Sequence, residues 1–336
     1  MCIRTSRPSP LLTRGLCSNV AIVTTFTSSS SEDAFFILSL LCELRAPPLL
    51  RLMASVLDEC AIDGPPNLSH LRADLASITS LVDLLACDIG GATKGAFGSR
   101  GEFQIVPECF YWEIRPWYNG GNWTYEGVVD PASGRLGLAG EWGGPSAGQS
   151  SLVHVIDLFL GVDHTPRPAA HPSTSAVDMT RPTLRAPVAD TDATFMLRAA
   201  RYMPGPHRAF LHHLCSFHVA SLSNPRPIPP LRTVANSDRA ELGEAYDAAV
   251  RSMQAFREMH FRLVTIFIIT QARRPPGPRS VFSNAWGEKH RAEGADETAR
   301  ERERERLQKE TLLGTGGTAL VPFLKGCRER TVEALL

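Results

Sequence analysis

The sequence lacks several features that would indicate a common functional class. Its 35 Lys and Arg residues equal its 35 Asp and Glu residues in number, so the net charge is zero and no basic surface for nucleic acid is indicated. Its eight cysteines are scattered and include no CxxC pair, which argues against a disulfide framework and favours a reducing cytosol. No apolar run reaches the roughly 18 residues that span a bilayer. We therefore expect no nucleic-acid partner, no membrane partner and a cytoplasmic location.

Two glycine-rich stretches lack the residues that would make them nucleotide-binding loops. Residues 143–151 do not contain the Lys-Ser/Thr pair of a phosphate loop, and no strand pattern precedes residues 314–318. Small residues do allow a ligand or another helix to approach the backbone closely. The 314–318 loop is therefore interpreted either as a flap over a pocket or as an ordinary linker.

A long helical pattern covers about residues 239–271, and one histidine lies on its apolar stripe. Spacings of three and four residues place the stripe on one buried face of a helix. A histidine in this setting is either a core residue bonded to a backbone carbonyl or an axial ligand of an iron porphyrin, because a neutral imidazole in an apolar cleft is the usual proximal haem ligand. The stripe consists of Tyr246, Ala249, Met253, Phe256, His260, Val264 and Phe267.

Several helices are predicted upstream. Four serines and two acids at 28–33 form a good helix start, and the helix over 34–44 is apolar all round, so we expect it to be buried. Phe35 and Ser39 share one of its faces, although a lone serine in a helix usually bonds back to the preceding turn. Further apolar helical patterns cover residues 49–60, 67–89, 152–160 and a last stretch from about Leu320.

A short aromatic helix is predicted over 107–117. Pro116 disfavours helical geometry at Arg115, so this guanidinium group is expected at a helix end or break. Two interpretations stay open for Arg115 and the aromatic residues around Phe110. Either the aromatic rings simply pack and Arg115 is a solvated charge, or Arg115 binds a carboxylate beside a wall of rings that stack on a ligand. After this helix, the Tyr125-Glu126-Gly127 segment is interpreted as part of a series of turns.

Three other stretches are interpreted by composition or spacing. Residues 162–192 are rich in Pro, Thr, Ala and Ser without periodicity and are predicted to be an irregular insertion. Residues 273–313 are predicted to be a linker followed by a charged, solvated helix. Zinc binding is kept as an alternative for one cluster that lacks the paired spacing of structural zinc sites. That cluster is His212, His213, Cys215 and His218.

Taken together, these stretches resemble the indoleamine 2,3-dioxygenase family, the cytosolic haem enzymes that open the indole ring of tryptophan. Eight pieces occur in the family's order across about residues 19–336, and this order makes the resemblance specific. They are residues 35–44, 110–115, 125–127, 146–151, 201–208, 244–248, 257–260 and 314–318.

The resemblance implies an all-α fold with irregular insertions, in which one large helical domain grips haem b between its helices. His260 would be the proximal ligand of the haem iron. Arg257, about one helical turn before it, would lie near the proximal side with Asp157 as its partner. Three small residues would approach the substrate and the porphyrin edge, namely Ser146, Ala147 and Gly148.

The same resemblance assigns residues to the substrate. Phe35 and Ser39 would line the distal side above the haem. Phe110 would pack against the indole ring, and Arg115 would pair with the substrate carboxylate. Thr315 would close over the substrate ammonium group and a haem propionate.

The implied reaction is cleavage of the indole 2,3 bond of L-tryptophan, or a related indoleamine, by O2 to give N-formylkynurenine, the first step of the kynurenine pathway towards NAD. An electron donor would keep the iron ferrous, and a monomer is expected. Such a site needs aromatic walls, a carboxylate clamp and small residues, and it needs no Ser-His-Asp or paired-carboxylate apparatus. The alternatives are a catalytically impaired haem-binding paralogue or fragment that acts in interaction or sensing, and a zinc-binding interaction protein.

Two departures from the family pattern bear on activity. The match begins only near Asn19, so the family's small amino-terminal domain, which covers the distal side, is expected to be essentially absent. The 162–192 stretch and the long spacing from Phe210 to Glu244 are insertions. We therefore divide the chain into an irregular extension over 1–18, with a basic composition compatible with an organelle transit peptide, and a helical haem domain over 19–336.

Overall fold

The computed structural model describes residues 3–5, 20–93, 104–164, 192–218, 229–277, 314–315 and 319–336, and helices dominate them. The all-α prediction is confirmed, and none of these helices is long and apolar enough to cross a membrane. The helices are α1 (Ser30–Leu44), α2 (Ala46–Cys60), α3 (Leu68–Gly90), α4 (Pro107–Cys109), α5 (Ser151–Leu160), α6 (Asp192–Ala200), α7 (Gly205–Ser216), α8 (Pro230–Ser237), α9 (Arg239–Val264), α10 (Thr270–Ala272) and α13 (Leu320–Val332).

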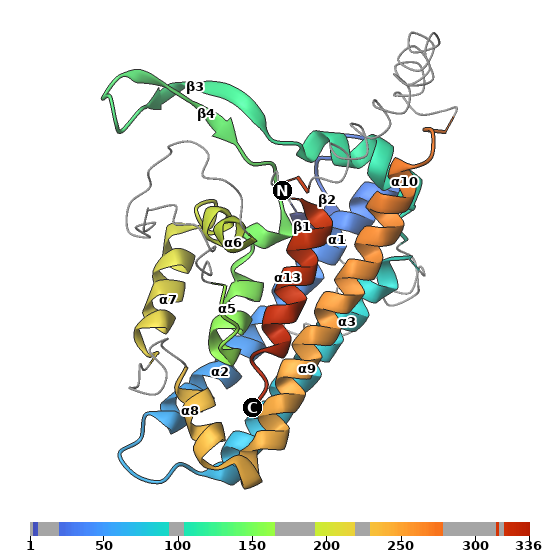
Figure 1. Ribbon diagram of the computed structural model, residues 1–336. Coiled ribbons are helices and arrows are strands. Elements are labelled where there is room, and N and C mark those ends of the chain that lie inside the picture. Colours follow the sequence, from blue (N-terminus) through green and yellow to red (C-terminus); the bar gives the residue numbers. More distant parts are fainter. Residues whose placement is uncertain are drawn as a thin grey trace, which may run out of the picture.

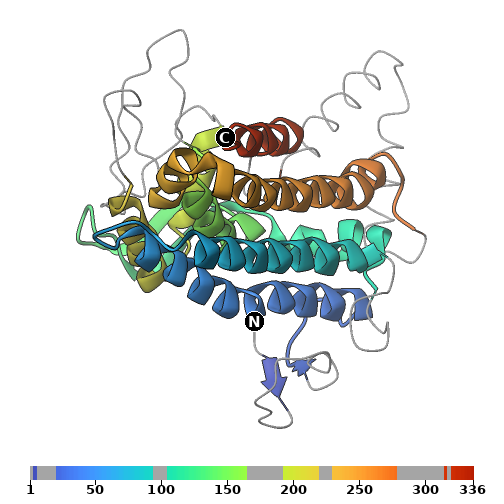
Figure 2. The same cartoon turned by 90° about the horizontal axis from the view of Figure 1, so that it is seen from below.

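The two longest helices, α3 and α9, lie side by side at the centre of the bundle (Figure 1). Figure 2 shows successive layers, with α1 and α2 on one side of α3 and α13 on the far side of α9. The buried face of α3 repeats at spacings of three and four residues, and the helix predicted over 67–89 is present. Burying each such side chain fully contributes roughly 1.5–3 kcal/mol. The residues of this face are Leu71, Leu75, Ile78, Val82, Leu85 and Ile89.

The stripe on α9 is confirmed over most of its length. Tyr246, Ala249 and Met253 are fully buried, and Val264 and Phe267 are buried near its end. The Tyr246 hydroxyl donates a hydrogen bond to the Leu160 carbonyl at 2.5 Å, which attaches α9 to the end of α5. His260 is partly buried between these two parts of the stripe.

Helix α1 begins as predicted but is not buried all round. The Ser29 side chain caps it by accepting a bond from the Glu32 amide at 3.2 Å. Ala34 and Ile37 are buried, whereas Ser39 is exposed. The expectation of complete burial was wrong because α1 forms an outer layer of the bundle (Figure 2), and no helix in the described part of the chain covers its other side.

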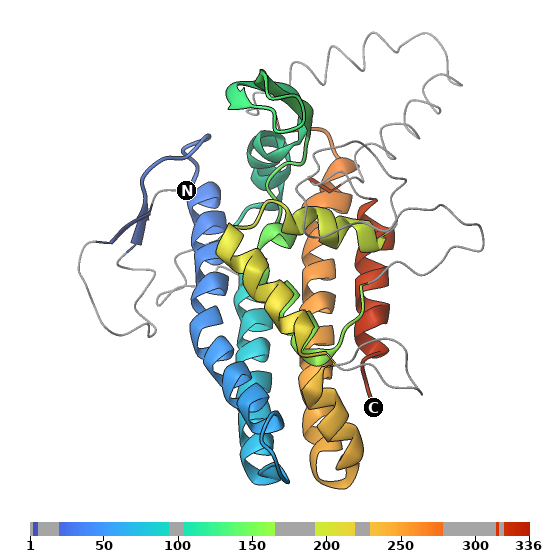
Figure 3. The ribbon, with the colours of Figure 1, turned by 90° about the vertical axis from the view of Figure 1, so that its left-hand side faces the viewer.

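A two-stranded hairpin extends away from the bundle (Figures 1 and 3). Strands β3 (Gly121–Val129) and β4 (Leu136–Trp142) pair antiparallel, so the interpretation of 125–127 as a turn was wrong. Trp142 packs across the strands against Trp123 at 6.3 Å and Tyr125 at 4.9 Å between ring centroids, and such cross-strand aromatic pairs stabilise a sheet.

The structure covers the predicted irregular segments only in part. Within the 1–18 extension, β1 (Ile3–Thr5) is a short strand that pairs with β2 (Val20–Ile22), so these three residues are regular rather than irregular. The other residues of the extension lie outside the described residues. So do most of the predicted insertion (165–191) and the charged stretch (278–313).

Candidate functional site

A π-helical turn carries Phe110 and leads into Arg115. Residues Phe110–Ile114 form the π-helical turn η3, and the 3-10 turn η4 (Arg115–Tyr118) follows it. The Arg115 amide donates to the Phe110 carbonyl, so the turn closes over five residues instead of four. Arg115 lies where one helical form gives way to another, but its backbone stays helical (φ −54°, ψ −37°), so the predicted departure from helical geometry at Arg115 was wrong.

Phe110 is part of an aromatic cluster drawn from three elements. Its ring centroid lies 5.1 Å from that of Phe35 on α1 and 5.6 Å from that of Phe267. Phe267 belongs to a second π-helical turn, η6 (Thr265–Ile269), which follows α9. Tilted and edge-to-face rings at such distances attract each other and hold one another in place. The structure therefore brings together the Phe35 and Phe110 that were predicted to form walls of one pocket.

Ser39 behaves as an ordinary helical serine. Its hydroxyl donates to the Phe35 carbonyl one turn earlier, at 3.0 Å, which is the back-bonding expected for a lone serine. Its side of α1 is exposed. Whether it faces a substrate remains a prediction.

Arg115 carries its charge in a poorly hydrated setting. Its guanidinium carbon lies 5.5 Å from the centroid of the Tyr111 ring, a cation–π distance. Burial lowers the pKa of Arg115, and the Tyr111 phenol opposes that shift. A guanidinium group removed from bulk water gains more from a carboxylate than an exposed one does. Its surroundings therefore suit the proposed clamp better than a solvated charge.

The small-residue loop contacts both the aromatic segment and the 314–315 segment. A Cβ atom on Gly144 would lie 1.8 Å from the Tyr118 carbonyl oxygen, so only glycine fits there. The Gly144 amide donates to the Thr315 carbonyl at 3.1 Å, and the Thr315 hydroxyl donates to the Pro145 carbonyl at 2.9 Å. Thr315 is thus held beside the start of the loop.

The rest of that loop is held by a capping box. The Ser146 hydroxyl accepts from the Gly148 amide at 3.3 Å, and the Gln149 side chain accepts from the Ser146 amide at 3.3 Å. A ring nitrogen of His154, on α5, lies 2.8 Å from the Gly148 carbonyl. Burial lowers the pKa of His154, so its neutral form is favoured. Sequence reasoning assigned Ser146, Ala147 and Gly148 to the site and missed the supporting His154.

His260 fits neither a salt-bridged nor a hydrogen-bonded core histidine. Within the described residues its ring makes no hydrogen bond, and its nitrogens are not among the sealed, unbonded side-chain atoms. Burial lowers the pKa of His260, and the charge of Arg257 lowers it further, so the imidazole is held neutral. The core alternative required a bond to a backbone carbonyl, and no such bond is present in this part of the structure.

Arg257 is locked in a buried polar network one turn before His260. It donates to Asp157 Oδ2 at 2.6 Å and to the Thr331 hydroxyl on α13. A ring nitrogen of His164 lies 2.7 Å from the same Asp157 oxygen. Burial raises the pKa of Asp157, but Arg257 and His164 outweigh it and bring the value to about 2. The expected pairing of Arg257 with Asp157 is present.

Sequence reasoning missed His164 and Thr331. His164 returns to Asp157 because Gly161, at φ +72°, ends α5 in the left-handed conformation, and the Val162 amide bonds back to the Asp157 carbonyl at 2.8 Å. The spacing of apolar residues along a helix does not predict the contact between His164 and Asp157, because the chain reverses at Gly161 before it reaches His164.

The zinc alternative is contradicted within the part of the chain that the structure describes, where no three His, Cys, Asp or Glu side chains are placed to hold a metal ion. The His213 ring instead packs edge-on against Phe217 at 4.8 Å. Burial raises the pKa of the Cys215 thiol, which disfavours the thiolate that zinc requires.

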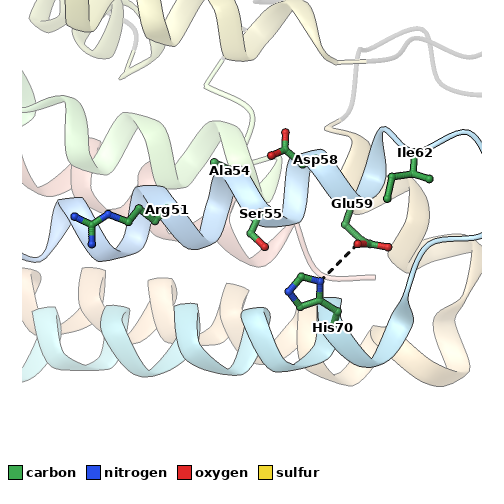
Figure 4. Close-up of a pocket in the computed structure, with 7 residues that line it drawn as sticks. All are labelled: Arg51, Ala54, Ser55, Asp58, Glu59, Ile62 and His70. Atoms are coloured by element: carbon green, nitrogen blue, oxygen red, sulfur yellow. Dashed lines mark ion pairs between the residues drawn. The ribbon is translucent and has the colours of Figure 1, made fainter.

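A separate depression lies between α2 and the start of α3 (Figure 4), at the end of the bundle opposite η3. Among its lining residues His70 lies 3.5 Å from Glu59, and His70 also lies 3.5 Å from Asp74 outside the depression. None of the predicted site residues lines it. The lining residues are Arg51, Ala54, Ser55, Asp58, Glu59, Ile62 and His70.

Comparisons with known proteins identify the family. The family model described as "Indoleamine 2,3-dioxygenase" matches residues 9–334. Indoleamine 2,3-dioxygenase of Saccharomyces cerevisiae is 28% identical over 333 residues, covering 94% of this chain and 61% of the yeast protein. The 6-hydroxytryptophan 2,3-dioxygenase of Fusarium equiseti is 27% identical (94% and 64%), and human indoleamine 2,3-dioxygenase 2 is 24% identical (95% and 62%). The chain thus spans about three fifths of the length of the curated relatives it matches.

Proposed function

Because this chain belongs to the indoleamine 2,3-dioxygenase family, we propose that it cleaves the 2,3 bond of the indole ring of L-tryptophan with O2 and gives N-formylkynurenine. The bond between carbons 2 and 3 breaks, and each carbon receives one oxygen atom of O2 as a carbonyl oxygen. No other oxidant is needed for this balance. An electron donor is required only to keep the iron ferrous, and we propose a monomer acting in the cytoplasm.

The observation that carries the proposal is the state of His260. A neutral imidazole without a hydrogen-bond partner in the described part of the chain is the form in which histidine binds iron. Arg257 is a buried cation one helical turn away, held by Asp157, and its charge helps to keep His260 neutral. These residues fit haem b, with His260 as its ligand. When bound, haem b would supply the ferrous iron that activates O2.

The remaining site residues would position the amino acid. Phe110 would hold the indole ring against the aromatic wall that it forms with Phe35. Arg115, whose guanidinium group lies over the Tyr111 ring, would bind the carboxylate. Thr315 is bonded to Pro145 in the 143–151 loop and would close over the ammonium group. Fixing the substrate in one orientation and excluding water are the protein's contributions to such a reaction.

A second candidate function is haem binding without turnover, in an interaction or sensing role. It is favoured by the exposed side of α1 around Ser39. If the distal side stays open to water, haem uptake would persist while cleavage would fail.

The first test is the absorption spectrum of the purified chain reconstituted with haem. We expect a Soret band for the wild type, its loss or a large shift in His260→Ala, and no change in the control His213→Ala, whose exposed ring only packs on Phe217. A His260→Ala protein with an unchanged spectrum would overturn the ligand assignment.

The second test is N-formylkynurenine formation under reducing conditions. Removing the charged partner of a carboxylate loses roughly 1.5–3 kcal/mol, so Arg115→Ala is expected to lower kcat/KM about 10- to 150-fold. Arg135→Ala, on the exposed hairpin turn, is the control. Wild-type haem uptake without product would favour the second candidate, and unchanged activity of Arg115→Ala would refute the clamp.

A further inference from the structure

Tyr118 occupies an aromatic enclosure at the end of η4. Its ring lies edge-on to Phe35 at 5.8 Å, to Phe36 at 6.4 Å and to Phe26 at 6.3 Å between centroids. The first two rings come from α1, and Phe26 comes from the segment that precedes it. Phe35 in turn contacts Phe110. The phenol therefore stands directly beside the wall proposed to hold the indole ring.

The Tyr118 hydroxyl is sealed from solvent and has no hydrogen-bond partner within the described residues. The nearby carboxylate of Glu32 is bonded elsewhere, to the Phe26 amide at 2.9 Å and to the Thr27 amide at 2.7 Å. Burial, and then the charge of Glu32, raise the pKa of Tyr118, so the phenol keeps its proton. A buried hydroxyl left unbonded is unfavourable and is rare in folded proteins. This atom therefore has donor and acceptor capacity that no described residue uses.

The backbone of Tyr118 ties it to the other proposed substrate-facing segment. Its carbonyl oxygen lies against Gly144 so closely that no Cβ fits there, and the Gly144 amide bonds to Thr315. The ring of Tyr118 thus contacts the aromatic wall, while its carbonyl group contacts the glycine that is bonded to Thr315. Its position is fixed on both sides, as a residue that discriminates between ligands requires.

We propose that Tyr118 is a specificity-determining residue whose hydroxyl binds a hydrogen-bonding substituent on the benzene half of the indole. The proposal rests on the proposed function. It predicts that the wild type prefers a ring-hydroxylated tryptophan over L-tryptophan more strongly than a variant without the Tyr118 hydroxyl does. The reason is that a site with an unpaired polar group favours the ligand that bonds to that group. The benzene half of L-tryptophan itself offers no hydrogen-bonding group for that hydroxyl.

The test is the haem-loaded variant Tyr118→Phe, which keeps the ring and removes only the hydroxyl. The measurement is kcat/KM for L-tryptophan, 5-hydroxy-L-tryptophan and 6-hydroxy-L-tryptophan. We expect kcat/KM for at least one hydroxylated substrate to fall about ten-fold relative to L-tryptophan. L-Tryptophan should be cleaved as well as before or better. Tyr125→Phe, on the exposed hairpin, is the matched control and should leave the ratios unchanged.

The outcomes separate this proposal from the proposed function. Cleavage of L-tryptophan with unchanged ratios in Tyr118→Phe would overturn the specificity role and leave the function standing. A uniform loss for all three substrates would also overturn it, since that result indicates a structural role. If the wild type cleaves none of them, the proposed function fails. The Tyr118 assignment is then tested by titrating the haem spectrum of the wild type and Tyr118→Phe with the same amino acids, which gives a Kd for each. Equal changes in Kd for hydroxylated and plain tryptophan would then overturn the Tyr118 assignment.

Discussion

The buried network around Asp157 allows a sharp stability prediction. Asp157 is 2% exposed and Arg257 is 9% exposed, and they meet at 2.6 Å. Asp157→Asn keeps the shape of the side chain but removes its charge, so Arg257 is left buried without a counter-ion. Breaking a buried pair from one side costs about 3–5 kcal/mol. We expect a loss of that size in the free energy of unfolding at pH 7, measured by urea denaturation followed by far-ultraviolet circular dichroism.

The pH dependence of the same comparison tests the cause. The pKa of Asp157 falls from 3.8 to about 2 on folding. The depressed value stabilises the folded state above about pH 4, and this stabilisation is lost as the pH falls towards 2. At about 1.36 kcal/mol per unit, the effect amounts to about 2–3 kcal/mol. The difference between the wild type and Asp157→Asn should therefore narrow by about that amount as the pH is lowered from 5 towards 2.

The control for both measurements is Asp58→Asn, which removes an exposed carboxylate on α2. It should change the free energy of unfolding by no more than about 0.5 kcal/mol. The reasoning would be refuted by an Asp157→Asn protein as stable as the wild type. It would also be refuted by a stability difference that stays constant over the whole pH range, since the loss would then not arise from the carboxylate's charge.

Two further substitutions test the contacts that frame the site. Gly144→Ala places a methyl group 1.8 Å from the Tyr118 carbonyl oxygen, so we expect the folded state to lose about 1–3 kcal/mol of stability, measured by thermal unfolding. The control is Gly127→Ala, where a Cβ atom would have no atom within 4 Å. Equal stability of the two variants would contradict the contact. Tyr246→Phe leaves the buried Leu160 carbonyl without its donor and should cost about 1–3 kcal/mol in the same assay, whereas no loss would show that this bond contributes nothing net.

The central helices could be predicted because their burial repeats along the sequence. The stripe on α9 needed only spacings of three and four residues, and α3 was predicted from its apolar composition. Helix α1 shows the limit of that reasoning: its composition indicates burial on all sides, but a pattern does not say which neighbour covers which side, and Ser39 is exposed. The hairpin was missed because glycines around Tyr125 suggested turns, whereas the stabilising contact is made across strands with Trp142.

The site residues differ in the same respect. The family resemblance predicts roles for His260 and Arg257, and the structure adds that the His260 ring makes no hydrogen bond within the described residues and that Arg257 has the buried partner Asp157. His164 and Tyr118 carried no signal in the sequence. His164 is noticed only through a contact made after a chain reversal, and Tyr118 only through a hydroxyl that no described residue bonds.

The two π-helical turns connect these observations. A π-turn is rare and has no distinct residue preference, so residues 107–117 and 239–271 were both predicted as ordinary helices. One turn carries Phe110 and Tyr111, the ring over which the Arg115 guanidinium lies, and the other carries Phe267 into contact with Phe110. The two turns therefore meet at Phe110, where the indole ring is proposed to bind.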